Sequence, residues 1–151
     1  MWTSLVISPR ASRSSSPEAS LGLSLSSVNI VSVGVDICDI GRMERALARH
    51  PSMSRRVFTA EEVAYCETRA RPAESYAGRF AAREAVIKAL GGYWGKRWKD
   101  ISVSRDVTGA PAIVLVGNAA PRAERLGIER FLISFSHERH SAVAFCVAVS
   151  E

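Results

Sequence analysis

Two acids and a lysine are the residues in this sequence whose types and spacing could do chemistry together. Asp36 ends a β-branched run, while Glu84 and Lys88 stand four residues apart in a helical pattern and so share one helix face. Magnesium prefers oxygen ligands and is usually held by one or two carboxylates, with the rest of its shell left for water and substrate phosphate. The pattern therefore predicts a magnesium site at Asp36 and Glu84, with Lys88 as a point charge for a phosphate oxygen.

These residues also have an ordinary structural explanation. An acid and a lysine one helical turn apart often form only an exposed ion pair, worth a few tenths of a kcal/mol, and Asp36 alone would be a polar strand end. Two features favour the functional interpretation. The acid and the lysine share their helix with small side chains that let a ligand or another chain approach closely, and Gly91 and Gly92 follow at once. The small residues are Ala81, Ala82, Ala85 and Ala89.

The elements that must position these residues begin at residue 30. Residues 30–36 are β-branched and predict a buried strand that ends in the acid Asp36. An amphipathic helix follows and ends before Pro51, with Arg42, Arg45 and Arg49 on a basic face. Thr59 and Glu62 have the spacing of a capping box, which predicts a short helix to about residue 69.

The longest predicted helix covers residues 74–90, and Gly91-Gly92 ends it. Strands at 101–104 and 112–116, joined by a turn, are followed by a helix from Asn118 to Gly127. A last hairpin pairs 131–136 with 142–149 and has 137–140 as its turn. Strands that pair by hairpins, with helices between them, indicate an α+β fold with an antiparallel sheet around a long central helix, rather than a doubly wound parallel sheet.

Composition limits the class of protein. The chain has 151 residues, 47% of them hydrophobic and 23% charged, which fits one globular domain. No apolar run approaches the roughly 20 residues that a membrane-spanning helix needs, so no membrane partner is expected. The formal net charge of +5 suggests an anionic partner, which could be nucleic acid, a membrane surface, a phosphorylated ligand or an acidic protein.

The first 27 residues differ from the rest. Ten of them are serine, and Arg10 and Arg13 are opposed only by Glu18. We expect residues 1–27 to be a disordered, non-catalytic extension and residues 28–151 to form the domain. Cys38, Cys66 and Cys146 are an odd number without metal-ligand spacing, which predicts three buried, reduced thiols in a cytoplasmic protein.

The motifs around these residues resemble the holo-acyl-carrier-protein synthases, a family of phosphopantetheinyl transferases. Residues 33–40, Val-Gly-Val-Asp-Ile-Cys-Asp-Ile, are similar to the G-(I/V)-D-(I/L)-x-x-(I/L) start of that family. Residues 80–91 resemble its (W/F)-(A/S)-x-K-E-(A/S)-x-x-K-(A/S)-x-G helix motif. Three shorter pieces also match in the family's order: residues 58–62, 109–111 and 133–137. The resemblance spans residues 30–150, and five pieces in register make it specific.

The resemblance implies a fold, a metal and two ligands of the site. Members of the family form α+β subunits that usually assemble as trimers, with active sites at subunit interfaces. By resemblance, Asp36 and Glu84 bind magnesium, which holds the pyrophosphate of coenzyme A, and Lys88 contacts phosphate. His137 resembles the residue placed near the adenosine bisphosphate half, and Arg71 is expected near the same phosphates. Arg83 departs from the lysine usual there, so it is not included among the catalytic residues.

The reaction implied is displacement at the β-phosphorus of coenzyme A by a serine of an acidic acyl carrier protein, with adenosine 3',5'-bisphosphate leaving. Positioning and charge neutralisation do most of the work in phosphoryl transfer. For the base that takes the serine proton, Glu84 acting through a water is the first choice and His137 the second. Whether the carrier serves fatty-acid or polyketide synthesis is left open by the sequence.

An alternative from another class is a non-catalytic basic module that binds an acidic protein or nucleic acid. Trp94 and Trp98, beside Lys96, Arg97 and Lys99, have the composition of a base-stacking patch, although such interleaving is more often a loop with a charged rim. The pairing of Asp36 with Glu84 and Lys88 favours the enzyme, and we expect no nucleic acid partner.

Overall fold

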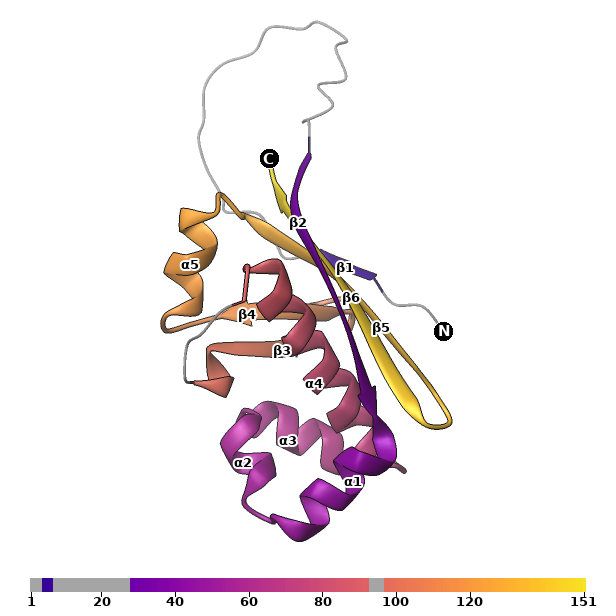
Figure 1. Ribbon diagram of the computed structural model, residues 1–151. Helices are drawn as coiled ribbons and strands as arrows, with labels where there is room; N and C mark the ends of the chain where they lie inside the picture. The colour runs from indigo at the N-terminus through magenta and orange to yellow at the C-terminus, as the bar shows by residue number, and fades with distance from the viewer. Residues whose placement is uncertain (1–3, 7–27, 93–96) are drawn as a thin grey trace, which may run out of the picture.

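The chain folds as an α+β domain, in which one long helix lies across an antiparallel sheet (Figure 1). The structure is a computed structural model, and it describes the backbone of residues 4–6 and, in full, residues 28–92 and 97–151. The main sheet has the order β1-β5-β6-β2, and a separate hairpin pairs β3 with β4. The strands are β1 Ser4–Val6, β2 Asn29–Asp39, β3 Ile101–Arg105, β4 Pro111–Leu115, β5 Arg130–Glu138 and β6 Ser141–Ser150. The helices are α1 Ile40–Arg49, α2 Met53–Val57, α3 Ala60–Glu67, α4 Pro72–Ala89, α5 Ala119–Arg125 and the short 3-10 helix η1 Trp98–Asp100.

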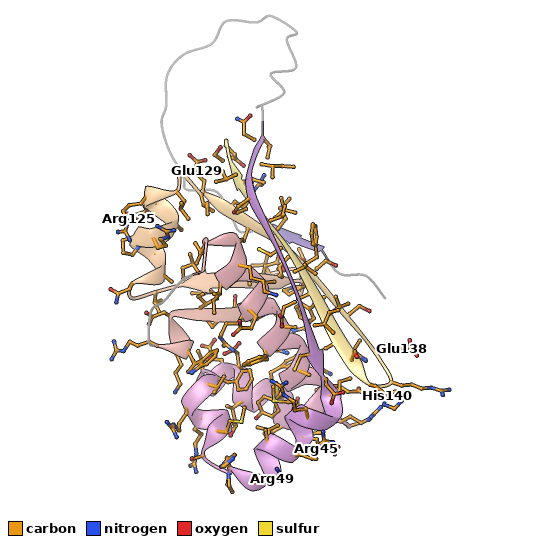
Figure 2. All side chains as sticks on the ribbon, in the orientation of Figure 1. Arg45, Arg49, Arg125, Glu129, Glu138 and His140 are labelled. Carbon is orange, nitrogen blue, oxygen red and sulfur yellow. The ribbon has the colours of Figure 1, made fainter. Side chains whose placement is uncertain are left out.

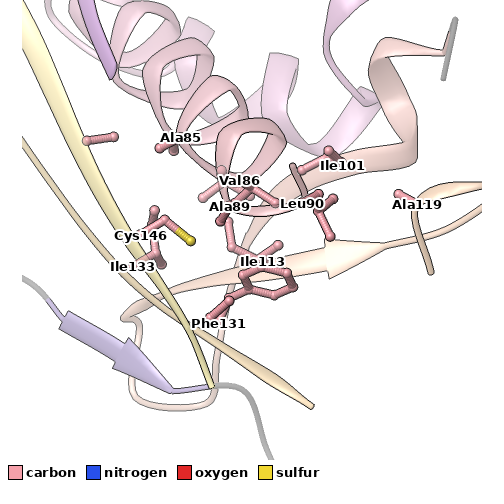
Figure 3. Close-up of a cluster of buried hydrophobic side chains, with 14 of the residues drawn as sticks. Ala85, Val86, Ala89, Leu90, Ile101, Ile113, Ala119, Phe131, Ile133 and Cys146 are labelled. Atoms are coloured by element: carbon pink, nitrogen blue, oxygen red, sulfur yellow. The ribbon is translucent and has the colours of Figure 1, made fainter. Parts of the chain in front are cut away.

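The larger core lies between α4, the inner face of the main sheet and the β3–β4 hairpin. Small residues of α4, such as Ala85 and Ala89, face Cys146 on β6, while Val86 and Leu90 point toward the hairpin side (Figure 3). Small side chains on both elements bring the helix close to the strands, because no large group holds them apart. The alanines of α4 therefore set how close the helix lies to the sheet. The sequence analysis had linked the same alanines to close approach by a ligand or another chain.

The first long strand differs from the expectation of a buried strand that ends at Asp36. β2 continues to Asp39, so Asp36 lies within it, and its apolar side chains alternate outward. Ile30 and Ile37 are 71% and 67% exposed. The reason is that α4 covers only one face of the antiparallel sheet, so the side chains on the other face of β2 are left exposed, as they are on β6. A continuous β-branched run is thus a poor guide to burial in an antiparallel sheet that is covered on one face.

The helical end of the molecule confirms most of what the sequence predicts. α1 ends at Arg49, before Pro51, and Thr59 and Glu62 form the expected capping box of α3. α4 begins two residues earlier than predicted, because Pro72 occupies its first turn, where a missing amide hydrogen costs nothing. α2 was not predicted. Its five residues are too few to show a helical period.

A buried ion pair connects α3, α4 and β3. Arg83 on α4 donates to both carboxylate oxygens of Glu62 on α3, at 2.9 and 3.1 Å, and also to the Ile101 carbonyl. The side chains are 0% and 1% exposed. Glu62 in turn accepts hydrogen bonds from the amides of Thr59 and Val103. Arg83 therefore connects α3, α4 and β3 in the interior of the domain.

The last hairpin is confirmed, with one correction to its turn. β5 and β6 pair along their whole lengths, but the strand β5 runs to Glu138, so His137 lies in a strand and not in the turn. The turn is Arg139 and His140 alone. Inclusion of His137 in the strand fixes its backbone more firmly than a loop would.

Three further expectations concern the tail, the thiols and the membrane. Ser4–Val6 pairs with β5, while the rest of the proposed disordered extension lies outside the described residues. The three cysteines are free thiols, but Cys38 is only half-buried, against the expectation for it. None of the helices described is long and apolar enough to span a bilayer.

Candidate active site

Asp36 is brought to the helix α4 by the glycine two residues before it. A side chain at Gly34 would place its Cβ 1.9 Å from the carbonyl oxygen of Ala85, so only glycine allows β2 to lie this close to α4. Two residues before Gly34, the hydroxyl of Ser32 donates to the carbonyl of Ala89, which also holds β2 against α4. The strand and the helix thus meet where Asp36 and Lys88 can reach each other.

Lys88 and Asp36 form the central contact of the candidate site. The Lys88 ammonium donates to Oδ1 of Asp36 at 2.9 Å and to the carbonyl oxygen of Val35 at 2.6 Å. Asp36 is largely covered, with its side chain 18% exposed, while Lys88 is 51% exposed. The lysine can therefore leave this contact for an incoming phosphate at little cost to the fold.

Glu84 lies one turn before Lys88 on α4 and is half-buried. Burial raises the pKa of the Glu84 carboxyl above its ordinary value, and the nearby negative charge of Asp36 raises it further, while Lys88 and Arg83 oppose the shift. Two carboxylates close enough to repel each other form a pair that a divalent cation would relieve. The structure thus brings Asp36, Glu84 and Lys88 together, as the sequence predicts.

Arg71 and His137 meet at a different place, around a residue that the sequence analysis missed. Glu74, in the first turn of α4, forms an ion pair with Arg71, and its other carboxylate oxygen lies 4.0 Å from Nδ1 of His137. Arg71 and His137 are exposed, whereas the Glu74 side chain is only 16% exposed. The sequence marks Glu74 only as the start of a helix, and no spacing in the sequence links it to His137, because that contact is tertiary.

The two groups of residues are separated along α4. Glu74 and Glu84 are ten residues apart on one helix, which is roughly 15 Å at 1.5 Å per residue. The described part of the chain contains no cluster of three or more His, Cys, Asp or Glu side chains that could hold a metal. A metal here would therefore have two protein carboxylates and would take the rest of its shell from water and a ligand, which is the usual arrangement for magnesium.

The cations that the sequence placed on α1 lie on the surface. Arg42, Arg45 and Arg49 are exposed, and Figure 2 shows Arg45 and Arg49 on the outer side of α1, at the end of the molecule where His140 also lies. Of the proposed aromatic and basic patch, Trp94 and Lys96 lie outside the described residues. Trp98 is 44% exposed and packs on the Phe80 ring at a centroid distance of 5.7 Å.

Comparison with known proteins places this arrangement in a family. Residues 32–146 match the family model of the 4'-phosphopantetheinyl transferase superfamily. A holo-[acyl-carrier-protein] synthase from Moorella thermoacetica is 43% identical over 122 residues, which cover 80% of this chain and 95% of the relative.

Solved structures agree with the sequence comparison. The holo-[acyl-carrier-protein] synthase from Neisseria meningitidis superposes with a TM-score of 0.70 at 32% identity, covering 80% of this chain and 98% of that one. The enzyme from Helicobacter pylori, solved in complex with coenzyme A, gives a TM-score of 0.66 at 30% identity, covering 77% and 98%. With a family match over most of the chain and relatives matched over nearly their whole length, this chain belongs to the 4'-phosphopantetheinyl transferase superfamily, among the holo-[acyl-carrier-protein] synthases.

Proposed function

We propose that this chain performs the transfer for which its family is named, and that Asp36, Glu84 and Lys88 are the residues that carry it out. The phosphopantetheine group of coenzyme A moves to a serine of an apo-acyl carrier protein, and adenosine 3',5'-bisphosphate leaves. The observation that carries the proposal is the Lys88–Asp36 contact beside Glu84, which joins residues 52 positions apart in the chain and gathers two carboxylates and a cation.

Asp36 and Glu84 are the proposed magnesium ligands. They fit the ion because both offer oxygen donors and because a cation, the Lys88 ammonium, already pairs with Asp36. Burial first, and the charge of Asp36 second, also raise the pKa of the Glu84 carboxyl, and a bound cation would offset both effects. Magnesium, when bound, would neutralise the charge of the coenzyme A pyrophosphate. The protein would then supply the two carboxylates and the position of the acceptor.

The remaining phosphate contacts are assigned to Lys88, Arg71 and His137. Lys88 is half exposed and can turn from Asp36 to a phosphate oxygen, as a flexible point charge. Arg71 and His137 are held near each other by Glu74, so they would approach the adenosine bisphosphate half as one unit. Removal of Glu74 should therefore weaken coenzyme A binding although this acid itself would repel phosphate.

The chemistry requires one bond to form and one to break. The serine oxygen attacks the β-phosphorus, the bond from that phosphorus to the bridging oxygen breaks, and the electron pair leaves with adenosine 3',5'-bisphosphate. We assign the serine proton to Glu84, acting through a water, because Glu84 already lies at the proposed metal position. His137 is the second choice for this proton.

A trimer with active sites at subunit interfaces accounts for two features of the subunit. The outer face of β2 and β6 exposes large apolar side chains, including Val35 and Phe145 at 50% and 48% exposure, and such a patch favours a protein interface. The separation of Glu84 from Glu74 suits a site built from two copies. Mixing an inactive Glu84→Ala protein with an inactive Arg71→Ala protein should then restore part of the activity.

An acidic acyl carrier protein is the proposed partner, docked on the basic side of α1. Arg42, Arg45 and Arg49 are exposed and form no ion pair within the residues that the structure describes. Complementary charge chiefly raises the association rate and fixes the orientation of the partner. The cytoplasm is the proposed location, since the thiols of Cys38 and the other two cysteines are free.

The direct test is incubation with apo-carrier protein, coenzyme A and magnesium, followed by measurement of the carrier's mass. We expect the mass to increase by one phosphopantetheine group, and only when magnesium is present. The competing interpretation, a basic module that binds without catalysis, predicts an unchanged carrier mass. Magnesium with coenzyme A should also raise the melting temperature of the transferase, because ligands that bind only the native state stabilise it.

A further inference from the structure

The last turn of α4 carries Lys88, and the helix ends just after it. The last four carbonyl groups of a helix have no donor within the helix, because no further turn follows them. In α4 these are the carbonyls of residues 87–90. The amide of Gly91 donates to the carbonyl of Lys88 at 3.0 Å, and that of Gly92 donates to Ile87, also at 3.0 Å. Both glycines have positive φ, so two of the four carbonyls are satisfied by the usual glycine end of a helix.

The other two carbonyls receive hydrogen bonds from side chains of distant elements. The hydroxyl of Ser32 on β2 donates to the carbonyl of Ala89. The Nε of Arg122 on α5 donates to the carbonyl of Leu90 at 3.0 Å. These donors lie 57 and 32 residues from their acceptors in the chain. The end of α4 is therefore held from two sides, by the strand β2 and by the helix α5, which lies beside it (Figure 1).

The carbonyl of Leu90 depends strongly on Arg122, because Leu90 is 0% exposed. Leu90 belongs to the larger buried cluster, together with Ala119 of α5 (Figure 3). A buried carbonyl without a donor costs more stability than an ordinary hydrogen bond contributes, since no water replaces the lost partner. Arg122 therefore supplies a hydrogen bond that the solvent cannot supply.

The charge of Arg122 also suits its place. It forms no ion pair within residues 28–92 and 97–151. Its guanidinium instead lies against the end of α4, where a Cβ added at Gly91 would come within 3.0 Å of one of its terminal nitrogens. The C-terminus of a helix carries partial negative charge, so a cation is favourable there. The hydrogen bond from Nε is directional, however, and it is this bond that fixes the position of the helix end.

The position of the helix end matters because Lys88 lies only two residues before Leu90. The Lys88 ammonium reaches Asp36 on β2, and this contact requires the last turn of α4 to keep its place. Terminal turns are the parts of a helix that open most easily. Phosphoryl transfer depends chiefly on charges held in position, so an open last turn would weaken what Lys88 does.

We propose that Arg122 is a positioning residue for coenzyme A, which acts through the last turn of α4 on Lys88. Arg122 donates to Leu90 and itself contacts no ligand, while Ser32 holds the same turn from the side of the sheet. This inference rests on the binding of a coenzyme A phosphate by Lys88, as proposed above.

The test compares Arg122→Met with Arg122→Gln, two variants of similar size. The amide nitrogen of glutamine is as many bonds from Cα as the Nε of arginine, so it can keep the hydrogen bond without the charge, whereas methionine has no donor. The quantity measured is the Kd of coenzyme A in the presence of magnesium, by calorimetry. We expect Arg122→Met to raise this Kd about three- to tenfold, and Arg122→Gln to stay within about twofold of wild type. Arg125→Met removes an exposed arginine of the same helix and should leave the Kd unchanged (Figure 2).

A second comparison separates positioning from a general loss of stability. If Arg122 acts through Lys88, then Lys88→Ala/Arg122→Met should bind coenzyme A as Lys88→Ala alone does. Hydrogen exchange at the amides of Gly91 and Gly92 should become faster in Arg122→Met and stay slow in Arg122→Gln. Ser32→Ala removes the other side-chain donor and should also raise the Kd, which gives a second variant if Arg122→Met folds poorly.

Three results would overturn the inference. The first is a wild-type Kd in the folded Arg122→Met and Ser32→Ala proteins. The second is an Arg122→Met effect that is equally large without Lys88, because the arginine would then act by another route. The third is binding by Arg122→Gln as weak as that of Arg122→Met, because the hydrogen bond would then not be the cause. If the expected pattern of Kd values appears but no phosphopantetheine is transferred, the proposed function is wrong and the positioning role stands.

Discussion

The Lys88 ammonium reaches from α4 to β2 and donates to Oδ1 of Asp36 at 2.9 Å, with a second bond to the carbonyl oxygen of Val35. This contact exists because Gly34 lets the strand lie against the helix without a side chain between them. Because the lysine is half exposed, the ion pair contributes little to stability, and we propose that this lysine serves to bind phosphate.

The first prediction concerns this lysine. Lys88→Ala should raise the KM for coenzyme A about tenfold through the loss of a charge-assisted phosphate contact, with the carrier KM unchanged. Steady-state kinetics with each substrate varied in turn would measure both. Lys88→Arg keeps the charge with a different shape and serves as the matched comparison. A coenzyme A KM equal to that of wild type in Lys88→Ala would reject the phosphate role.

The second prediction follows from the raised pKa of Glu84. A carboxyl whose pKa is higher in the folded state than in the unfolded state lowers stability once it ionises, so stability falls as the pH rises from the ordinary glutamate range through the raised pKa. Glu84→Gln should therefore melt about 1 to 3 °C above wild type at pH 7 without metal. This difference should vanish below about pH 4, where the Glu84 carboxyl is largely protonated in both the folded and the unfolded state.

Thermal melts in chelator at several pH values would test this point. The same variant should be inactive. A higher melting temperature together with lost activity would show that Glu84 lowers the stability of the fold while it serves function. A Glu84→Gln protein that melts below wild type at pH 7, or a difference that persists at acid pH, would contradict the assignment of the pKa to burial and to Asp36.

The third prediction concerns the buried pair of Arg83 and Glu62. Arg83→Met leaves the Glu62 carboxylate buried without its partner, which should lower the unfolding free energy by about 3 to 5 kcal/mol. Arg83→Lys keeps the charge and should cost less. Urea denaturation measures the loss. If the pair is purely structural, the folded fraction of Arg83→Lys should keep the wild-type kcat, and a large fall in kcat at full folding would give Arg83 a catalytic role.

The fourth prediction concerns the basic side of α1. Reversal of Arg42 and Arg45 to glutamate should raise the carrier KM about tenfold or more, with coenzyme A affinity nearly unchanged. The wild-type carrier KM should rise with salt, since added ions screen exposed charges. Kinetics at low and high ionic strength would measure both effects, with Arg125→Glu as a control. A carrier KM insensitive to salt and to charge reversal would rule out α1 as a docking surface.

Local patterns in the sequence predicted much of this fold, because they depend on near neighbours. The capping box of Thr59 and Glu62, the end of α1 before Pro51 and the glycines after α4 are all set by backbone geometry within a few residues. The exposure of β2 could not be predicted in the same way, because it depends on which face of the sheet the helix α4 covers.

The candidate site could likewise be predicted only where it depends on local spacing, and not where it depends on tertiary contacts. Glu84 and Lys88 share a helix face by their spacing, and Asp36 was paired with them from the preference of magnesium for carboxylates, a pairing that the family resemblance also implies. Nothing local could have linked Glu74 to His137, or Glu62 to Arg83, since these pairs join residues far apart in the chain. The capping box already explained why an acid stands at position 62. The sequence therefore gave no sign that Glu62 is also the partner of the buried Arg83.

The transfer rate in Asp36→Ala and Glu84→Ala tests the central claim most directly. The measurement is the initial rate at which apo-carrier gains mass with saturating magnesium and coenzyme A, with Glu124→Ala on α5 as the matched loss of a surface acid. We predict that both site variants fold and lose activity by about a thousandfold or more, because each lacks one of two carboxylates for the metal, while Glu124→Ala keeps the wild-type rate. Near wild-type turnover in either Asp36→Ala or Glu84→Ala would contradict the shared metal site.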